Sequence, residues 1–365
     1  MTVGIVAFGA YVPATRLPVG RGEKAVAGHD EDAITLAVAA CLDALSDIDR
    51  SSVDALFFAS TTRPFAEKQG AALIARALDL RRDVVTVDYG GSLRAGTSAL
   101  RGALDSVRAR TSRSVLVVAS DCRSAQGTLE SKLGEAAAAF LVADGDALAT
   151  VEATHAIADE ILDVWRVEGD AAPRAWEERF VVKHGARANL VEAVNGLCRH
   201  VGQAPGDFEH AALYGFDAKD HGELARALKL DPARVVDPLF GKVGNAGAAF
   251  VPLLIAAALE RAKPAERILA ASYGDGAEVF ALCATEHVTR SSKRRGVAGH
   301  VERRRPVKAA AYWAARAAIM STAASGGGVS ATKHWRERDE DVSMKAQACR
   351  GCGTHHFPAQ RVCIR

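Results

Sequence analysis

The sequence predicts an α/β fold built from two similar halves, and three observations support this prediction. Short, continuously apolar strands alternate with helices along most of the chain, which is typical of a sheet covered on both faces. The order of elements before about residue 150 recurs after it, which indicates an internal duplication. A length of 365 residues suggests two domains or a repeat with an appendage. We place the two halves at 1–150 and 151–320, a flexible linker at 321–345 and a small terminal module at 346–365.

The bulk composition narrows the class of protein. Hydrophobic residues make up 49% of the chain, and 46 basic side chains nearly balance 44 acidic ones, leaving a net charge of +2. Such a chain is neither disordered by composition nor a general nucleic-acid binder. No apolar run reaches the ~18 residues of a membrane span, and no basic leader precedes an apolar segment at the start. We therefore expect a cytoplasmic protein with neither membrane nor nucleic acid as a partner.

The first half is predicted to contain five strands and three helices. The strands are runs of apolar and β-branched residues, whereas the helices show apolar residues at helical spacing. We expect strands at 3–11, 53–60, 84–87, 114–121 and 136–142, and helices at 31–45, 71–80 and 95–107.

The second half is predicted to repeat this order around an irregular insert at 163–180. A strand near Val151 precedes the insert, and the other elements follow it. We expect a long helix ending near 201, a strand at 211–215, a helix running from 244 to 259, and strands at 268–273 and 278–284. The strongly basic stretch 290–308 has two interpretations, a solvated connector or a cationic surface for phosphates or docking.

The stretch from Asp88 to Leu100 is where a strand passes into a helix of small residues. Backbone N–H groups at the start of such a helix face outward, and several enzyme folds place a nucleophile there, opposite an anionic or thioester ligand. A simpler interpretation is a tight turn whose glycines serve packing alone, because isolated glycine patterns carry little information.

The seven cysteines fall into two groups. Four are scattered through the apolar elements and are expected to be small core residues: Cys41, Cys122, Cys198 and Cys283. The other three, Cys349, Cys352 and Cys363, follow a linker rich in glycine, and Cys-x-x-Cys-Gly spacing is typical of a zinc knuckle. A closed zinc site needs a fourth ligand. We expect it from His355 or His356 or from a residue beyond Arg365, and otherwise the site stays unfilled.

Several motifs resemble the thiolase superfamily, in particular 3-hydroxy-3-methylglutaryl-CoA (HMG-CoA) synthases and type III ketoacyl-ACP synthases. They are Gly4-Ile5 to Pro13, Ala95-Gly96-Thr97 with Ala99-Leu100, Val118-Ala119-Ser120-Asp121, Val243 to Ala248, Ala271 to Ala277, and Val301-Glu302-Arg303-Arg304 with Tyr312. The resemblance implies a duplicated, five-layered α/β/α/β/α fold, a coenzyme A thioester ligand and a homodimer.

The end of the chain resembles the zinc ribbon that precedes an OB fold in small acyl-CoA-binding modules. The matching residues are Cys349, Cys352, Phe357, Pro358 and Cys363, and no OB fold follows them in this sequence. The resemblance implies structural zinc and a complex with an active thiolase-type subunit or an OB-fold acyl-CoA-binding protein.

The resemblance breaks at the residues that carry the family's chemistry. Its cysteine nucleophile, four residues before the threonine of Ala-Gly-Thr, is replaced by Leu93. Its glutamate base corresponds to Thr61 and its histidine to Phe216, whereas its loop asparagine is retained as Asn245. Because a leucine holds no acyl group and the three groups act together, we expect no covalent catalysis. The sequence therefore predicts an HMG-CoA synthase-like, non-catalytic or scaffold subunit.

An alternative is an enzyme that makes or breaks C–C bonds of acyl-CoA thioesters without a cysteine. General acid–base chemistry needs only a positioned group of suitable pKa. The candidates are Tyr89, Ser92, Tyr214, Asp217, His221 and Asn245. Simpler roles remain open for several of them: Ser92 is one residue out of register with the missing cysteine, the loop 217–221 suits a helix cap, and Asn245 suits backbone hydrogen bonding.

Overall fold

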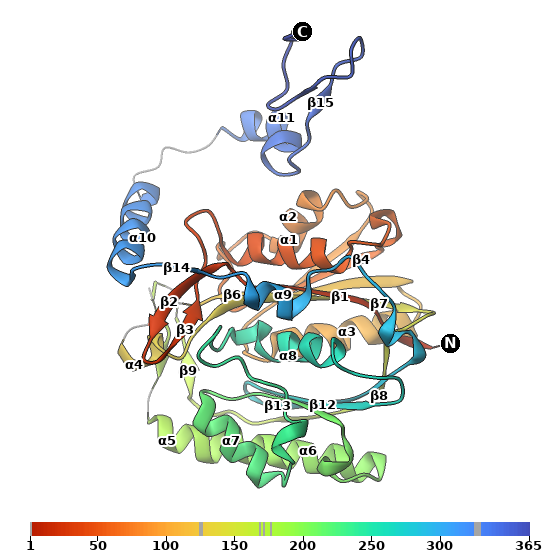
Figure 1. Cartoon of the computed structure of the whole chain (residues 1–365), viewed down its shortest axis with the longest axis vertical. Coiled ribbons are helices and arrows are strands. Elements are labelled where there is room, and N and C mark those ends of the chain that lie inside the picture. Colours follow the sequence, from red (N-terminus) through yellow and green to blue (C-terminus); the bar gives the residue numbers. More distant parts are fainter. Residues whose placement is uncertain (1, 124–126, 168, 171, 176, 325–329) are drawn as a thin grey trace.

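A computed structural model describes residues 2–123, 127–167, 169–170, 172–175, 177–324 and 330–365. Its largest sheet has nine strands in the order β11-β12-β13-β8-β1-β7-β6-β4-β5. Strands β1 and β8 pair through only two residue pairs, Gly4 with Thr150 and Ile5 with Ala149. The sheet folds over at this narrow junction, so that two half-sheets face each other across a layer of helices (Figure 1).

The first half-sheet and its helices come from the first half of the chain. In order, its elements are β1 Val3–Tyr11, α1 Ala33–Ala44, β4 Ala55–Ala59, α2 Gly70–Ala77, β5 Val85–Tyr89, α3 Ala95–Arg108, β6 Ser114–Cys122 and β7 Glu135–Asp144. Strand β4 pairs in parallel with β5 and β6, whereas β7 runs antiparallel to β6 and β1. All eight predicted elements are present, with ends shifted by a few residues.

The second half repeats this order. Its elements are β8 Ala149–Ala158, α6 Ala188–Val201, β11 His210–Leu213, α7 Ala218–Ala227, α8 Phe250–Leu259, β12 Arg267–Tyr273 and β13 Gly276–Ala284. The counterpart of β5 is reduced to a single parallel bridge between Ala211 and Val235. The predicted duplication is therefore visible in the order of elements, with one strand shortened.

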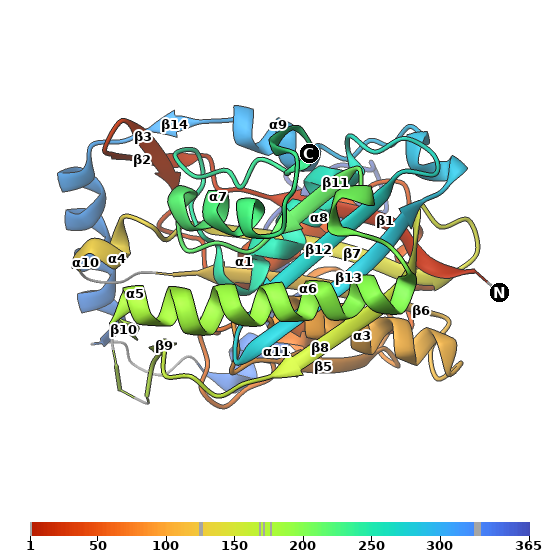
Figure 2. The same cartoon turned by 90° about the horizontal axis from the view of Figure 1, so that it is seen from below.

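The two half-sheets and their helices form five layers. Helices α1 and α2 cover the outer face of the first half-sheet, α3 and α8 lie between the half-sheets, and α6 and α7 cover the outer face of the second (Figures 1 and 2). The central layer is tightly packed, because a Cβ at Gly96 would press on the Ala248 carbonyl and lie 2.8 Å from Pro252 Cγ. The predicted α/β/α/β/α fold is confirmed.

Smaller elements decorate the edges of this body. They are β2 Thr15–Val19, β3 Gly22–Ala25 and β14 Arg305–Pro306 in one small sheet, β9 Val164–Trp165 and β10 Arg174–Ala175 in another, helices α4 Gly127–Glu130, α5 Glu178–Phe180 and α9 Gly296–Glu302, and the π-helix Val181–Arg187. The insert at 163–180 therefore contains a short hairpin.

The basic stretch 290–308 packs against residues of the first half of the chain. The Lys293 backbone donates to Asp47 near the end of α1 at 2.7 Å, and Arg304 forms an ion pair with Glu23 at 2.6 Å. The Arg294 guanidinium lies over the Phe8 ring, 4.0 Å from its centre. These contacts favour the connector interpretation of the stretch.

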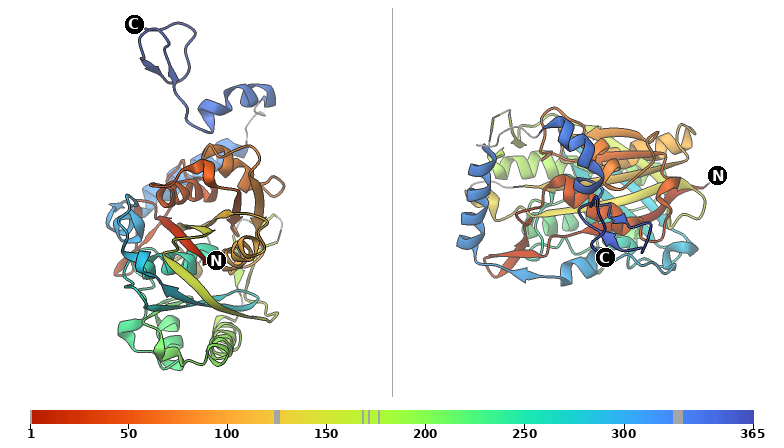
Figure 3. Two further views of the ribbon diagram at one scale, coloured as in Figure 1. Left: turned by 90° about the vertical axis from the view of Figure 1, so that its right-hand side faces the viewer. Right: turned by 90° about the horizontal axis from the view of Figure 1, so that it is seen from above.

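The C-terminal part comprises α10 Ala309–Ala324, α11 Ala331–Asp341, β15 Gln347–Ala348 and β16 His355–His356. Helix α11 lies within the segment 321–345 that we predicted to be a linker; the Ser330 hydroxyl caps its start, and strong helix formers follow. The module that follows α10 stands apart from the layered body on the side of α2 (Figures 1 and 3). Polar contacts join it to the body, including an ion pair of Lys345 with Asp79 at 2.6 Å. Within the described residues, none of the helices has the length and apolar character to cross a membrane.

Candidate functional site

A pocket of about 820 Å³ opens beside the N-terminus of α3, a size typical of small-molecule sites. Its wall is formed by Gly28, His29, Glu31, residues 60–66, 91–93, Cys122, Arg123, residues 160–166, Pro173, Gly274, Asp275 and Arg316. Strands β4 and β6 are parallel neighbours, so their carboxyl ends meet here. Three of the predicted site residues, Thr61, Ser92 and Leu93, line this pocket together.

Leu93 occupies the wall just before α3 and is 9% exposed. Its hydrocarbon side chain presents no nucleophile to a bound molecule. The neighbouring Ser92 hydroxyl lies against the glycine turn after β12, where a Cβ at Gly274 would be 2.6 Å from Ser92 Oγ. Across the described residues, Ser92 Oγ accepts a hydrogen bond from the Arg94 backbone N–H at 3.5 Å, and no histidine is hydrogen-bonded to it.

Thr61 belongs to a hydrogen-bonded hub around Asp121, which is fully buried near the end of β6. The Asp121 carboxylate accepts hydrogen bonds at 2.9 Å from the hydroxyls of Ser60, Thr61 and Thr62. It also accepts from the backbone N–H groups of Thr61 at 2.7 Å, Thr62 at 3.0 Å and Ala248 at 2.7 Å. These hydrogen bonds fix one wall of the pocket. The Thr61 hydroxyl therefore has a structural role as a donor to Asp121.

Cys122 follows Asp121 and also lines the pocket. Burial raises the pKa of its thiol well above the ordinary value, and the nearby carboxylates of Glu135 and Asp121 raise it further. Since the thiolate is the reactive form of cysteine, Cys122 is a poor nucleophile in this position. We predicted Cys122 to be a small core residue, and this prediction missed that it also lines the pocket.

Phe216 lies in an aromatic cluster and is not among the residues that line the pocket. Its ring packs on Tyr214, with centres 5.4 Å apart, and on Tyr273 at 5.9 Å. Asn245 is buried beside this cluster, where its amide donates to the Gly215 carbonyl at 2.8 Å. Tyr214 is also buried, and this burial raises the pKa of its hydroxyl.

Three other predicted candidates also lie outside the pocket lining. The Tyr89 ring packs on Phe57, and its hydroxyl lies against Gly102 of α3. Asp217 caps α7, because its carboxylate accepts from the backbone N–H of Asp220 at 3.0 Å. Burial lowers the pKa of His221 to about 4, which keeps its imidazole neutral at pH 7.

Asp163 and Tyr273 form a polar pair that the sequence did not single out. Asp163 lies in the insert and lines the pocket, and burial raises the pKa of its carboxyl. Tyr273 ends β12 and is fully buried. Burial and the neighbouring Asp163 raise the pKa of its hydroxyl. Neither the tyrosine hydroxyl nor Asp163 Oδ2 has a hydrogen-bond partner of ordinary geometry among the described residues.

The polar ends of β4 and β6 could have been found from the sequence. Ser60-Thr61-Thr62 and Asp121-Cys122-Arg123 end two predicted strands, and parallel strands bring such ends to one edge. The insert gave no comparable signal, because its short strands have no clear periodicity.

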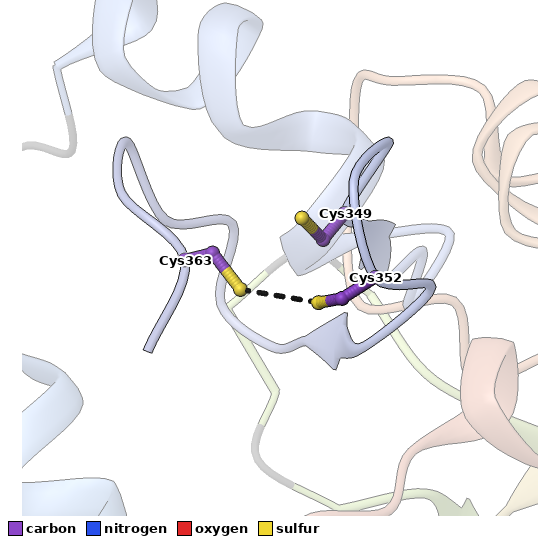
Figure 4. Close-up of side chains that lie close together, drawn as sticks. All are labelled: Cys349, Cys352 and Cys363. Carbon is purple, nitrogen blue, oxygen red and sulfur yellow. Dashed lines mark hydrogen bonds between the residues drawn. The ribbon is translucent and has the colours of Figure 1, made fainter. Parts of the chain in front are cut away.

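The three C-terminal cysteines lie together, as Figure 4 shows. Their sulfur atoms are all within 4.8 Å of one another, and those of Cys352 and Cys363 are 3.5 Å apart. Tetrahedral zinc with bonds of about 2.3 Å to sulfur separates two thiolates by about 3.8 Å, so this spacing fits the ion. The group found among the described residues contains neither His355 nor His356.

Comparison with known proteins identifies the family. No protein-family model matches the chain. The hydroxymethylglutaryl-CoA synthase of Pyrococcus furiosus is 31% identical over 338 residues, which cover 86% of this chain and 96% of that protein. The fold is similar to that of MvaS in complex with 3-hydroxy-3-methylglutaryl coenzyme A, with a TM-score of 0.74, 20% identity, and coverage of 86% of this chain and 91% of the other. It is also similar to 3-oxoacyl-(acyl carrier protein) synthase III from Pseudomonas aeruginosa, with a TM-score of 0.69, 20% identity, and coverage of 78% and 98%. The chain therefore belongs to the hydroxymethylglutaryl-CoA synthase family.

Proposed function

We propose that this protein binds a coenzyme A thioester in the pocket without forming an acyl-enzyme, and that it acts as a non-catalytic subunit of an acyl-CoA complex. The observation that carries the proposal is Leu93, a hydrocarbon at the pocket wall where its relatives' nucleophile is expected. The pocket itself remains open and holds polar groups, which supports retained ligand binding.

Intact-protein mass spectrometry after incubation with acetyl-CoA tests the covalent step. We expect unmodified protein, together with reversible binding of acetyl-CoA in calorimetry. The variants Cys122→Ser and Ser92→Ala serve as controls, because these residues line the same pocket. An acetyl adduct on the wild type that disappears in either variant would overturn the proposal and identify the nucleophile.

A second candidate function, cleavage of a β-hydroxyacyl-CoA without a cysteine, is favoured by the pair of Asp163 and Tyr273. A carboxylate with a raised pKa is suited to accept a proton from a substrate hydroxyl. In a retro-aldol step, the O–H electrons form a carbonyl, the Cα–Cβ bond breaks, and its electron pair enters the thioester as an enolate. The enolate then takes up a proton at carbon, so the step needs no oxidant or metal.

The two candidates give different results with purified protein and 3-hydroxy-3-methylglutaryl-CoA. A non-catalytic subunit leaves the thioester intact, whereas a lyase releases acetyl-CoA and acetoacetate. Activity that is lost in Asp163→Asn but retained in Asp217→Asn, a carboxylate outside the pocket lining, would assign the chemistry to Asp163. Activity only in the presence of a cysteine-bearing partner would support the non-catalytic role.

The C-terminal cysteines support a zinc site with three protein thiolates, which would hold this module together. Elemental analysis tests this directly, and we expect about one zinc per chain, lost when Cys349 and Cys352 are both replaced by serine. The thermal unfolding of the layered body should be unaffected by this change, because the ion pairs that join it to the module involve solvent-accessible side chains. Full zinc content in the double variant would contradict the assignment.

Two surfaces support the assembly that we propose. Strand β5 is the outer strand of the sheet, and its Val85 is 54% exposed, so this edge is available for a second copy of the chain. The C-terminal module exposes Trp335, Phe357, Val362 and Ile364, a set of apolar residues suited to a protein partner. Light scattering of the full chain, alone and with its co-purified proteins, tests both.

A further inference from the structure

Glu135 is a buried carboxyl group directly behind the pocket wall. It begins β7 and is 2% exposed, and its partner on the neighbouring strand β6 is Cys122, which lines the pocket. One of its oxygens accepts a hydrogen bond from the Ala27 backbone, and the next residue, Gly28, also lines the pocket. Neither proposed function uses this carboxyl group. Burying an ionisable group is costly, so Glu135 requires an explanation.

Arg316 of α10 is the cation that faces Glu135. Its Nη1 lies 3.9 Å from Glu135 Oε1, within ion-pair distance, and donates to the Tyr312 hydroxyl at 2.7 Å. The Tyr312 hydroxyl in turn donates to the Ala27 carbonyl at 3.1 Å. Arg316 also lines the pocket, and its side chain is 28% exposed. Its guanidinium therefore lies between a buried carboxyl group and the space that a ligand would occupy.

The other charged and titratable groups around this carboxyl are either engaged elsewhere or neutral. Lys24 of β3 donates to the Glu130 carbonyl at 2.8 Å and forms an ion pair with the Glu130 carboxylate. Burial raises the pKa of the Cys122 thiol well above its ordinary value and that of the Tyr312 hydroxyl to about 12, so both are uncharged at pH 7. Among the described groups that face this carboxyl, Arg316 therefore supplies the positive charge for which a ligand can compete.

Glu135 ionises near neutral pH. Burial raises the pKa of its carboxyl to about 7, whereas Arg316, the Ala27 N–H and Lys24 act to lower it. An anion that binds Arg316 from the pocket side competes with the carboxylate for the same positive charge. The ionised form of Glu135 then loses part of its stabilisation, so its pKa rises further. In the pH range above 7, binding of an anion is therefore accompanied by uptake of a proton.

We propose that Glu135 makes ligand binding in this pocket proton-dependent: the protonated carboxyl releases Arg316 to bind a phosphate group of the ligand, whereas the ionised carboxylate holds it back. The inference rests on the proposed binding of a coenzyme A thioester, whose phosphates are the anionic groups concerned. A guanidinium presents parallel N–H donors that match a phosphate. Because the complex holds the extra proton, the affinity is constant at low pH and falls as the pH rises through the pKa of the free protein.

Isothermal titration calorimetry with acetyl-CoA, in two buffers of different ionisation enthalpy, counts the protons that the full chain takes up on binding. At pH 8 we expect the wild type to take up about 0.3–1 proton per bound acetyl-CoA more than Glu135→Gln does. The wild type should also bind about fivefold more weakly at pH 8.5 than at pH 6.5, whereas the affinity of Glu135→Gln should change by less than about twofold. Glutamine keeps an oxygen acceptor for the Ala27 N–H, so this variant retains that contact.

Two further variants separate this coupling from other sources of protons. Arg316→Met should also lose the pH dependence, because the ligand and Glu135 then no longer share a cation. His29→Asn is the matched control: it removes a histidine that lines the same pocket, and the affinity should still fall between the two pH values.

Equal proton uptake by the wild type and Glu135→Gln, or a pH dependence that disappears in His29→Asn, would overturn the inference while leaving thioester binding in place. Failure of the wild type to bind acetyl-CoA at either pH would instead refute the proposed function itself, and the inference with it.

Discussion

Replacing Asp121 with alanine should be among the most destabilising changes near the pocket. The side chain is fully buried and accepts six hydrogen bonds, three from hydroxyls and three from backbone N–H groups. A hydrogen bond to a charged acceptor contributes about 1.5–3 kcal/mol, but the donors of Thr61 and Thr62 are partly exposed and can bind water after the change. Because the losses are not additive, we expect a decrease of about 3–5 kcal/mol in the free energy of unfolding.

Urea denaturation followed by circular dichroism measures this difference, with Ser120→Ala as the matched control. Ser120 is the preceding residue of β6 and is equally buried, yet its hydroxyl has no hydrogen-bond partner among the described residues. Its removal should therefore cost less than about 1 kcal/mol or stabilise the protein. A loss below about 1 kcal/mol in Asp121→Ala, or equal losses in the two variants, would refute the view that Asp121 holds this wall together.

Two further changes test the pocket and its surroundings. Burial raises the pKa of Glu135 from 4.5 to about 7, against the lowering effect of Arg316. The folded state therefore binds the extra proton, and stability should fall by up to about 3 kcal/mol as the pH rises from 4.5 to 7. Urea titrations across this range should show a flatter dependence in Glu135→Gln, and parallel curves would contradict the assignment. Leu93→Cys places a thiol just before α3, and we expect acetyl-CoA to form a stable adduct on it, detectable by mass spectrometry, without condensation to HMG-CoA. Turnover by this variant would show that a base remains in the pocket.

The fold could be predicted from the sequence because strand and helix signals agree with the tertiary structure. The apolar runs at 55–59 and 114–122 are buried between helix layers. Their continuous apolar pattern was therefore sufficient to predict these two strands. The second half was harder, because its counterpart of β5 is one bridge at Val235 with little pattern of its own. Helix α11 was missed for another reason, since it has no buried residues and its helix-forming side chains resemble a solvated linker.

Residues of the candidate site could be predicted from the sequence only where they lie at the ends of regular secondary-structure elements. Thr61, Ser92 and Leu93 end or begin regular elements, and the pocket brings these three together. Tyr89 lies on such an edge as well, but strand alternation turns its ring toward Phe57 and away from the pocket. The pair of Asp163 and Tyr273 could not be predicted in this way, because Asp163 lies in the insert and meets the end of β12 only in the folded chain.

The residues that replace the family's catalytic groups make favourable contacts with their neighbours. This argues against a site that has lost its catalytic groups without compensation. The Thr61 hydroxyl is bound to Asp121, so a glutamate at this position would place a second carboxylate beside a buried one and raise the energy of both. The Phe216 ring fills a cluster with Tyr214 and Tyr273, where a histidine would leave a polar ring among aromatic neighbours. Restoring the glutamate at Thr61 or the histidine at Phe216 alone would therefore disturb contacts that these two side chains now make. The pocket therefore combines a hydrocarbon side chain at the expected reacting position with a wall held by Asp121, and this combination suits binding of a thioester better than its covalent transfer.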